Sequence, residues 1–341
     1  MFNIRRPAHA DSVPQQSEWK TPTQEEIHVI QSYLGANIAK LLQKKIDTHP
    51  TRLVGYYRTT GVDRLFIKIL SDENSDTQNN AEQISAWLYH HGLSVHCVRD
   101  EFPKKIEEHG LWVYVYDYLD FEFSKSCKKQ LYSLGKEVNN MHRLMNKHPD
   151  RKNVYVRGTE KSQILFDQLN KIKSDKIVLN FPESAIEIIK ETRDSDYQLL
   201  SQGAQMIHGD MNYGNVLFNK LSDQPIIIDF EDATTAWLSP LYDLAFIIQR
   251  FILLQEVKDR YGLGIALLKG YKSQNILAKT SRPNDLLIML KMISVRSLLV
   301  LSMLSDENQI LYLDEINKFI ELYRQAQDDS ELISDINMLI N

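Results

Sequence analysis

Two carboxylates and one amide lie at a spacing that suits phosphoryl transfer. Asp210 precedes Asn215 by five residues, and Asp229 follows Asn215 by fourteen residues, directly after the apolar run Ile226-Ile227-Ile228. An aspartate can take a proton from a hydroxyl group that attacks a phosphate, and amide and carboxylate oxygens bind Mg²⁺ beside nucleotide phosphates. We therefore expect Asp210 to be a catalytic base and Asn215 and Asp229 to hold Mg²⁺.

Short apolar segments must bring these three side chains together. Residues 205–208, 216–219 and 226–230 are expected to form short strands that alternate with loops. The last of these strands would aim Asp229 back at the loop that carries Asp210. Gly209 and Gly214 allow turns in this loop that other residues resist.

A lysine on an earlier strand is a candidate for binding the nucleotide. In Arg64 to Leu70, alternation places Phe66 and Lys68 on one face of the strand and three aliphatic residues on the other. A lone strand lysine is more often a solvated side chain. The motif around Asp210 instead favours a lysine on the α- and β-phosphates, with Glu82 of the following helix as its partner and Glu73 as a rival.

The hydrophobic period divides the chain into two parts. Residues 1–22 are polar with three prolines and are expected to be an irregular lead. A capping box of Thr23 and Glu26 opens an amphipathic run predicted to continue to about Lys45. Expected next are a hairpin (52–58 and 64–70, with a turn at 59–63), a helix (80–91) and two strands (93–98 and 111–118).

Helical periodicity dominates after residue 118. The predicted helices span residues 124–148, 159–174, 183–202, 238–257, 264–273, 285–305, 307–327 and 332–341. The sequence therefore predicts an α+β protein with two lobes, a sheet-containing nucleotide-binding lobe over residues 1–118 and a mainly helical lobe over residues 119–341. The second lobe would hold the catalytic loop and the acceptor site.

Composition narrows the class of protein. The 341 residues carry a net charge of −5, which argues against a nucleic-acid partner. The two cysteines, Cys97 and Cys127, provide neither a disulfide framework nor a zinc-site spacing. No signal-peptide pattern opens the chain, and no uninterrupted apolar run is long enough to span a membrane. We expect a cytoplasmic protein with no membrane partner; the oligomeric state stays open.

The two motifs together resemble a known family. His208-Gly209-Asp210 with Asn215, followed by Ile228-Asp229-Phe230-Glu231, is similar to the paired motifs of the aminoglycoside phosphotransferase and choline kinase family. The likeness runs from about Arg52 to Leu304. It implies a protein-kinase-like two-lobe fold and an ATP-dependent small-molecule kinase that moves the γ-phosphoryl group to a hydroxyl of its acceptor.

The resemblance also implies roles for residues outside the motifs. Phe66 would stack on the adenine, and the backbone of Tyr118 and Leu119 would contact the edge of the base. No Gly-x-Gly-x-x-Gly precedes Lys68, so the residues that clamp the triphosphate are unassigned and GTP stays possible. His208 and Asp243 match family positions that brace the catalytic loop.

The acceptor pocket is expected between the catalytic loop and the helices of the second lobe. Aromatic and acidic side chains there suit a cation such as an aminoglycoside or a choline-like amino alcohol, whereas Arg250 or Arg296 would suit an acidic acceptor such as a hydroxy amino acid. Sugars also remain possible acceptors. The candidate residues for this pocket are Tyr213, Glu231, Asp232, Trp237 and Tyr242; Glu231 has a second possible role beside the metal.

Two other functions fit the same residues less well. A protein kinase is disfavoured because the chain lacks an Ala-Pro-Glu segment and has only about a dozen residues between Asp229 and Asp243. A non-catalytic nucleotide-binding scaffold is the second alternative. Such a protein typically loses its base or a metal ligand, whereas this chain keeps all four of the expected residues: Lys68, Asp210, Asn215 and Asp229.

Overall fold

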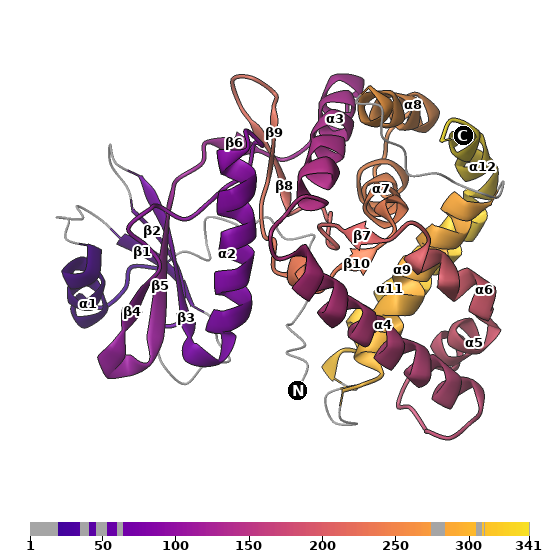
Figure 1. Cartoon of the computed structure of the whole chain (residues 1–341), viewed down its shortest axis with the longest axis horizontal. Helices are drawn as coiled ribbons and strands as arrows, with labels where there is room; N and C mark the ends of the chain where they lie inside the picture. The colour runs from indigo at the N-terminus through magenta and orange to yellow at the C-terminus, as the bar shows by residue number, and fades with distance from the viewer. Residues whose placement is uncertain are drawn as a thin grey trace.

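The protein folds into a sheet-containing lobe and a helical lobe (Figure 1). The computed structural model describes residues 20–34, 41–45, 53–59, 64–273, 284–304, 309 and 311–340. Residues 1–19 of the expected irregular lead (1–22) and most of the hairpin turn at 59–63 lie outside the described residues. The two-lobe α+β arrangement expected from the sequence is confirmed.

The N-terminal lobe is a five-stranded antiparallel sheet in the order β1-β2-β3-β5-β4. Helices α1 and α2 lie on opposite sides of this sheet, and α2 separates it from the helical lobe (Figure 1). The elements are α1 (Gln24–Leu34), β1 (Leu41–Lys45), β2 (Gly55–Thr59), β3 (Leu65–Ser71), α2 (Ser75–His90), β4 (Lys104–Ile106) and β5 (Leu111–Asp117).

Alternation along β3 separates the core of this lobe from the face that meets α2. Leu65, Ile67 and Ile69 are buried in the hydrophobic core that also contains Ile30 of α1. Phe66 and Lys68 lie on the opposite face and are partly exposed. The predicted alternation is therefore confirmed, and Lys68 points to the side of the sheet that is nearer the helical lobe.

Short strands in the second lobe frame the segments that carry the motifs. One small sheet has the order β6-β8-β9, and a second sheet pairs β7 with β10. Their bounds are β6 (Phe121–Glu122), β7 (Gln205–Met206), β8 (Val216–Asn219), β9 (Pro225–Ile227) and β10 (Trp237–Leu238).

Helices form the rest of the second lobe (Figure 1). They share one hydrophobic core. They are α3 (Lys128–Met145), α4 (Arg151–Lys173), α5 (Glu183–Glu191), α6 (Asp194–Tyr197), α7 (Pro240–Ile248) with a π-helical extension (Gln249–Leu253), α8 (Arg260–Lys272), α9 (Asp285–Leu301), α11 (Leu313–Asp328) and α12 (Ser330–Met338).

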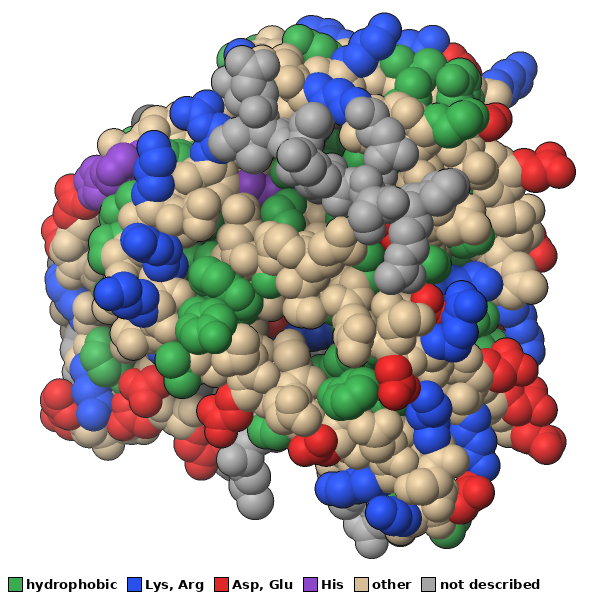
Figure 2. Space-filling model, turned by 45° about the vertical axis from the view of Figure 1, so that its right-hand side comes forward, with side chains coloured by type: hydrophobic (Ala, Val, Ile, Leu, Met, Phe, Trp, Pro, Cys, Tyr) green, Lys and Arg blue, Asp and Glu red, His purple; other side chains and the backbone are tan. Residues whose placement is uncertain are grey.

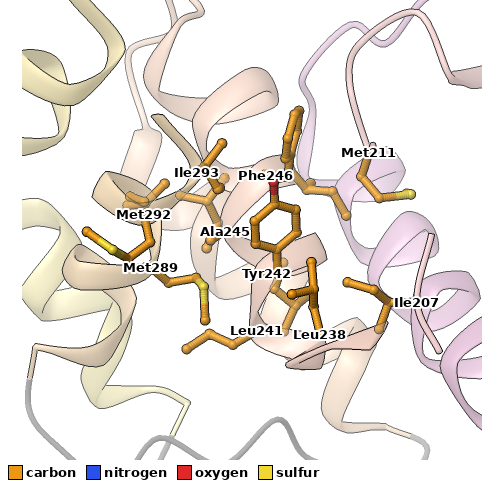
Figure 3. Packing of buried hydrophobic residues seen from close by; sticks show 14 of the residues in the cluster. Ile207, Met211, Leu238, Leu241, Tyr242, Ala245, Phe246, Met289, Met292 and Ile293 are labelled. Atoms are coloured by element: carbon orange, nitrogen blue, oxygen red, sulfur yellow. The ribbon is translucent and has the colours of Figure 1, made fainter. Parts of the chain in front are cut away.

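Helix α7 places the centre of this core beside the segment that precedes Asp210. The ring of Tyr242 lies among Ile207, Leu238 and Ala245, with Ile293 of α9 nearby (Figure 3). Because interiors are closely packed, this contact ties the position of the catalytic segment to the packing of α7 against α9.

Three predicted elements are wrong. The helix that begins at Gln24 ends at Leu34, because residues 41–45 instead form β1, whose backbone pairs with β2. The capping box is confirmed: the Thr23 amide donates to a Glu26 carboxylate oxygen at 2.6 Å. The amphipathic pattern thus spans residues of both a helix and a strand, and only the pairing with β2 distinguishes the two.

Residues 93–98 do not form a strand of the N-terminal sheet. Val95 makes one parallel bridge to Ile227 of β9, and the Ile227 amide donates to the Ser94 carbonyl at 3.0 Å. Leu93 and Val95 are buried in the core of the helical lobe. This segment therefore joins the two lobes rather than extending the first sheet.

The helix predicted over residues 183–202 is interrupted. It leaves the helical conformation at Thr192, whose hydroxyl donates to the Ile188 carbonyl, and continues as α6 and a 3₁₀ turn (Gln198–Ser201). Such local side-chain bonds compete with the helical ladder. Strands β4, β6 and β10 are too short to give a sequence signal.

The distribution of surface charge and the apolar character of the helices are the two features relevant to possible partners. Acidic and basic side chains are interspersed over the face seen in Figure 2. Within the described residues, no helix has both the length and the apolar character needed to cross a membrane.

Helices α3 and α8 approach each other through glycines, and this contact gives a stability prediction. A Cβ on Gly135 would lie 2.0 Å from the Leu267 carbonyl oxygen, so Gly135→Ala must push the two helices apart. Alanine favours a helix by ~1 kcal/mol, whereas overpacking costs ~1–3 kcal/mol. Because this clash is with backbone atoms, we place the cost at about 3 kcal/mol and expect a net loss of about 2 kcal/mol.

Urea unfolding of Gly135→Ala and wild type measures this loss. Lys136→Ala, an exposed position on the same helix, is the control and should change the free energy of unfolding by less than about 0.5 kcal/mol. Equal stability of Gly135→Ala and wild type would contradict the close contact.

Candidate active site

Asp243 holds the backbone of the segment that leads to Asp210. The amides of His208 and Gly209 donate to its two carboxylate oxygens at 3.0 and 2.9 Å, and His142 of α3 donates to it at 2.9 Å. Asp243 lies in the first turn of α7 and is fully buried. The predicted bracing role of Asp243 is confirmed by these bonds.

His208 braces the loop from within. Its Nδ1 accepts from the Asp210 amide at 3.2 Å, so Nε2 carries the proton that is donated to the Ile228 carbonyl at 3.0 Å. Both ring nitrogens are therefore occupied by backbone groups. These bonds confirm that His208 braces the loop, as predicted.

Position 209 requires a glycine for two reasons: its backbone conformation and the lack of space for a side chain. Its φ is +85°, and an added Cβ would lie 2.8 Å from the Ala236 Cβ. The segment that precedes β10 thus packs directly against the catalytic loop.

Asp210 lies in a network of amide donors. Asn215 Nδ2 and Asn212 Nδ2 each donate to Asp210 Oδ2 at 2.9 Å, and Asn215 Nδ2 also donates to the Asp210 carbonyl at 3.0 Å. Burial, with the negative charges of Asp232 and Asp229, raises the pKa of Asp210 to about 7. A carboxylate with a pKa near neutrality is suited to accept a proton at physiological pH.

Asp229 is exposed beside this loop. The Ile228 amide donates to the Asn215 carbonyl at 3.0 Å, so the two motifs are joined through their backbones. Asp229 has a φ of +64°, an uncommon conformation for a residue with a side chain. The structure therefore brings together the three residues that the sequence singled out for phosphoryl transfer.

The side-chain oxygens of Asn215 and Asp229 are suited to Mg²⁺ that is already bound to the phosphates of a nucleotide. Asn215 uses its amide nitrogen for both bonds to Asp210, so its oxygen is the atom suited to a cation. The described residues contain no cluster of three or more His, Cys, Asp or Glu side chains arranged to hold a metal. Mg²⁺ in kinases takes one or two protein ligands and completes its shell with phosphates and water, as Asn215 and Asp229 would allow.

Lys68 reaches the motif segment from the N-terminal lobe. Its Nζ lies 2.7 Å from Glu231 Oε1 and donates to Gln78 Oε1 at 2.6 Å. Gln78 Nε2 in turn donates to Glu82 Oε1. Glu82 is thereby linked to Lys68 through Gln78, and Glu231, predicted for the acceptor pocket, instead pairs with the lysine.

Glu82 also accepts a hydrogen bond from the Tyr116 hydroxyl at 2.6 Å. Burial raises the pKa of Glu82 despite the hydrogen bond from Tyr116 and the charge of Lys68. Glu73, the rival partner for Lys68, is exposed on the turn before α2. Helix α2 and strand β5 together therefore hold Glu82 behind Lys68.

The predicted base-binding residues lie along β3 and after β5. Phe66 is partly exposed and stacks on Tyr56 at a centroid distance of 5.9 Å. The Tyr118 amide donates to the Arg64 carbonyl at 2.9 Å. Within the described residues, the Tyr118 carbonyl and the Leu119 amide keep no protein partner, so they are the hinge groups suited to a base edge.

The structure separates the predicted acceptor-pocket residues. The Tyr213 hydroxyl donates to the Ser124 carbonyl, and Trp237 packs edge-on against Tyr155 at 5.2 Å. Tyr242 is buried, which raises its pKa to about 12. Asp232 is exposed, and an added Cβ on Gly209 would lie 3.5 Å from the Asp232 Cβ, so Asp232 flanks the catalytic loop.

Sequence reasoning missed Gln78, Asn212 and Lys161. Gln78 lies four residues before Glu82 on one helix face, which is a usable signal. Asn212 caps its own turn by accepting from the Gly214 amide at 2.7 Å, as asparagines in loops often do. Lys161 of α4 has no such signal; its Nζ lies 3.9 Å from Asp232 Oδ1 only because α4 packs against this turn.

The sequence and the fold were each compared with those of known proteins. The sequence pattern of the phosphotransferase enzyme family matches residues 54–273. No curated protein matches the chain in sequence.

Solved structures share the fold at low sequence identity. Spectinomycin phosphotransferase APH(9)-Ia with ADP and spectinomycin aligns with a TM-score of 0.57 and 13% identity, covering 90% of this chain and 98% of that one. For the GDP complex of aminoglycoside 2′-phosphotransferase-IIIa the values are 0.55, 15%, 90% and 100%. For a microcompartment-associated aminopropanol kinase they are 0.51, 12%, 90% and 98%. These likenesses establish the protein-kinase-like fold.

The pKa of Asp210 makes stability depend on pH. Because burial raises this pKa from 3.8 to about 7, the folded protein binds more protons than the unfolded chain between these values. The free energy of unfolding contributed by Asp210 therefore falls as pH rises from about 4 to about 7. Without metal or nucleotide, wild type should lose about 1–3 kcal/mol relative to Asp210→Asn between pH 5 and pH 8.

Parallel urea titrations of the two proteins at several pH values measure this difference. A difference in unfolding free energy that is constant between pH 5 and pH 8 would contradict the raised pKa.

Proposed function

The chain belongs to the phosphotransferase enzyme family, and we propose that it transfers the γ-phosphoryl group of ATP to a hydroxyl of a small molecule. One observation carries this proposal: the Asp210 carboxylate is held by Asn215 in a loop whose backbone is bonded to the segment carrying Asp229. Such a set of a base and two oxygen ligands for Mg²⁺ is what phosphoryl transfer requires.

Each residue then has a separate task. Asp210 accepts the proton of the acceptor hydroxyl, because its pKa of about 7 balances availability against basicity. Asn215 and Asp229 would hold Mg²⁺, which when bound neutralises charge on the phosphates. Asp243 and His208 act as positioning residues that keep the loop backbone in place.

The nucleotide is proposed to lie between the lobes. Lys68 would exchange its pairing with Glu231 for the phosphates while Gln78 and Glu82 keep it in place. Phe66 would contact the base, and Tyr118 and Leu119 would bond its edge. The division between the lobes after residue 118 is part of this proposal.

ATP is the proposed donor, and GTP is the alternative to test, because one structural relative was solved with GDP. The scaffold alternative predicts nucleotide binding without transfer, and a protein kinase would require a peptide platform after Asp229. The candidate acceptors are aminoglycosides, choline-like amino alcohols, hydroxy amino acids and sugars.

A screen for acceptor-dependent release of ADP or GDP tests the function. It uses purified full-length protein, Mg²⁺, each nucleotide in turn and a panel from the four acceptor classes. Turnover with a small acceptor supports the proposal. Nucleotide binding without release in the presence of any panel member would favour the scaffold.

Removing the base should separate binding from chemistry. Asp210→Asn keeps the size and the amide contacts of the side chain but cannot accept the proton. We expect kcat to fall by about 10²–10⁴-fold while Mg·ATP still raises the melting temperature. The measurement is steady-state ADP release beside thermal unfolding; unchanged kcat would reject Asp210 as the base.

Removing a metal ligand should affect binding as well. In Asp229→Ala the Mg²⁺-dependent part of the ATP-induced melting shift should largely disappear, because one of the two protein oxygens is lost. The shift is measured with ATP in the presence of Mg²⁺ or of EDTA. An Asp76→Ala variant, changed at an exposed position on α2, should retain the full difference.

A further inference from the structure

We propose that the acceptor carries a negatively charged group, a carboxylate or a phosphate, and that Lys161 and Arg296 bind it beside Asp210. This inference rests on the proposed function and specifies the chemical class of its acceptor. The two cations come from α4 and α9, helices that pack against each other and, through α4, against the turn that contains Asp232.

Lys161 is held at the edge of the catalytic loop. Its Nζ donates to Thr235 Oγ1 at 3.1 Å and lies 3.9 Å from Asp232 Oδ1. The Asp232 side chain is 53% exposed, whereas that of Lys161 is only 18% exposed. An exposed carboxylate at this distance only partly compensates a buried ammonium group.

Arg296 adds a second positive charge from α9. Its guanidinium carbon lies 5.8 Å from the centroid of the Tyr242 ring. Among the described residues no carboxylate pairs with Arg296. The side chain is only partly exposed, so an arginine with its planar set of donors is held near buried tyrosines without an anionic partner.

The two cations influence each other. The pKa of Lys161 is lowered first by burial and then by the positive charge of Arg296, and the charge of Asp232 does not reverse this. Burial raises the pKa of Tyr197 to about 12 and the charge of Arg296 opposes this rise, so Arg296 also lies near Tyr197, whose hydroxyl donates to the Ser162 carbonyl next to Lys161. Two cations that repel each other in a partly buried place are stabilised by a bound anion.

This cationic pair lies close to the proposed base. Asp232 contacts the loop next to Asp210, and its charge contributes to the raised pKa of Asp210. A hydroxyl at Asp210 and an anion at Lys161 and Arg296 could therefore belong to one small molecule. Arg250, whose charge also acts on Asp210, adds to the positive potential.

An aromatic site for a cationic acceptor is less well supported. Tyr213 is stacked on Phe123 at 5.7 Å and Trp237 is covered by Tyr155. Tyr242 is buried, and its accessible neighbour is Arg296. The rings that could enclose a cation are thus engaged with protein groups or lie beside a positive charge.

The test uses pairs of acceptors in which one member carries the anionic group and the other does not. The panel pairs three- to six-carbon hydroxy acids with their primary amides, and sugar monophosphates with the free sugars; an amino alcohol and an aminoglycoside are added. Full-length wild type, Lys161→Gln, Arg296→Gln and Arg296→Lys are compared for ADP release. Lys173→Gln is the control, because it removes a lysine from the far end of the same helix.

We expect turnover with charged members of the pairs only. For the preferred anion, Lys161→Gln and Arg296→Gln should raise KM by about 10–100-fold with a smaller effect on kcat, the loss typical of one charge-assisted hydrogen bond. Arg296→Lys should recover part of this loss, and Lys173→Gln and the KM for ATP should not change. Whether hydroxy acids or sugar phosphates are turned over identifies the source of the charge.

Other outcomes separate the two proposals. Equal or better turnover of the amide, free sugar, amino alcohol or aminoglycoside would overturn the anionic acceptor and leave the kinase activity intact. If no panel member is turned over, thermal unfolding with Mg·ADP decides: anionic members must stabilise wild type and not Arg296→Gln, and no such stabilisation rejects the inference. If Mg·ATP does not raise the melting temperature of the wild-type protein, the proposed function itself is rejected.

Discussion

The buried carboxylate of Asp243 is the interaction on which the rest of the site depends. It accepts hydrogen bonds from two consecutive backbone amides, those of His208 and Gly209, and from the His142 imidazole. These contacts join α3, α7 and the catalytic loop at one point. A fully buried charge is tolerated only when its hydrogen-bonding capacity is filled, so the loop backbone has little freedom once α7 has packed. This arrangement fixes the backbone that leads to Asp210, and the amides of Asn212 and Asn215 then hold its carboxylate.

The electrostatics of the site follow from two opposite arrangements of charge. Burial, together with the negative charges of Asp232 and Asp229, raises the pKa of Asp210 and favours its protonated form. Lys68 is instead paired with Glu231, which brings a residue of the N-terminal sheet into contact with the segment after Asp229. The acidic group around Asp210 is suited to Mg²⁺ and a proton, and the lysine to phosphate. The lobes are therefore linked by charges that a bound nucleotide would compete for.

Features of the fold and the site that depend on the local sequence could be predicted from it, whereas features that depend on tertiary packing could not. The faces of β3, the capping box at Thr23 and the bracing roles of His208 and Asp243 all agree with the structure, because each depends on side-chain period, short-range hydrogen bonds or a recognisable motif. The helix predicted to continue to Lys45 and the strand predicted at 93–98 fail, because residues 41–45 pair with β2 and Val95 bridges to Ile227. Neither partner, the neighbouring strand β2 nor Ile227, which lies 132 positions further along the chain (227 − 95), leaves a period in the local sequence.

The sequence by itself determined which reactive groups are present: two carboxylates and an amide at loop spacing, and a lysine on a strand. It also determined that a sheet-containing part is followed by a helical part. Only the tertiary structure decided that Gln78 stands between Lys68 and Glu82, that Glu231 pairs with Lys68, and which of the candidate side chains are buried in packing. It also placed Lys161 beside Asp232 and Arg296 over the Tyr242 ring, where the charges of the two cations influence each other although 135 positions separate them (296 − 161). Residue types and short spacings are properties of the chain alone. The burial and the neighbours of a charge are set by helices that meet only after folding, and these determine its pKa and its partner.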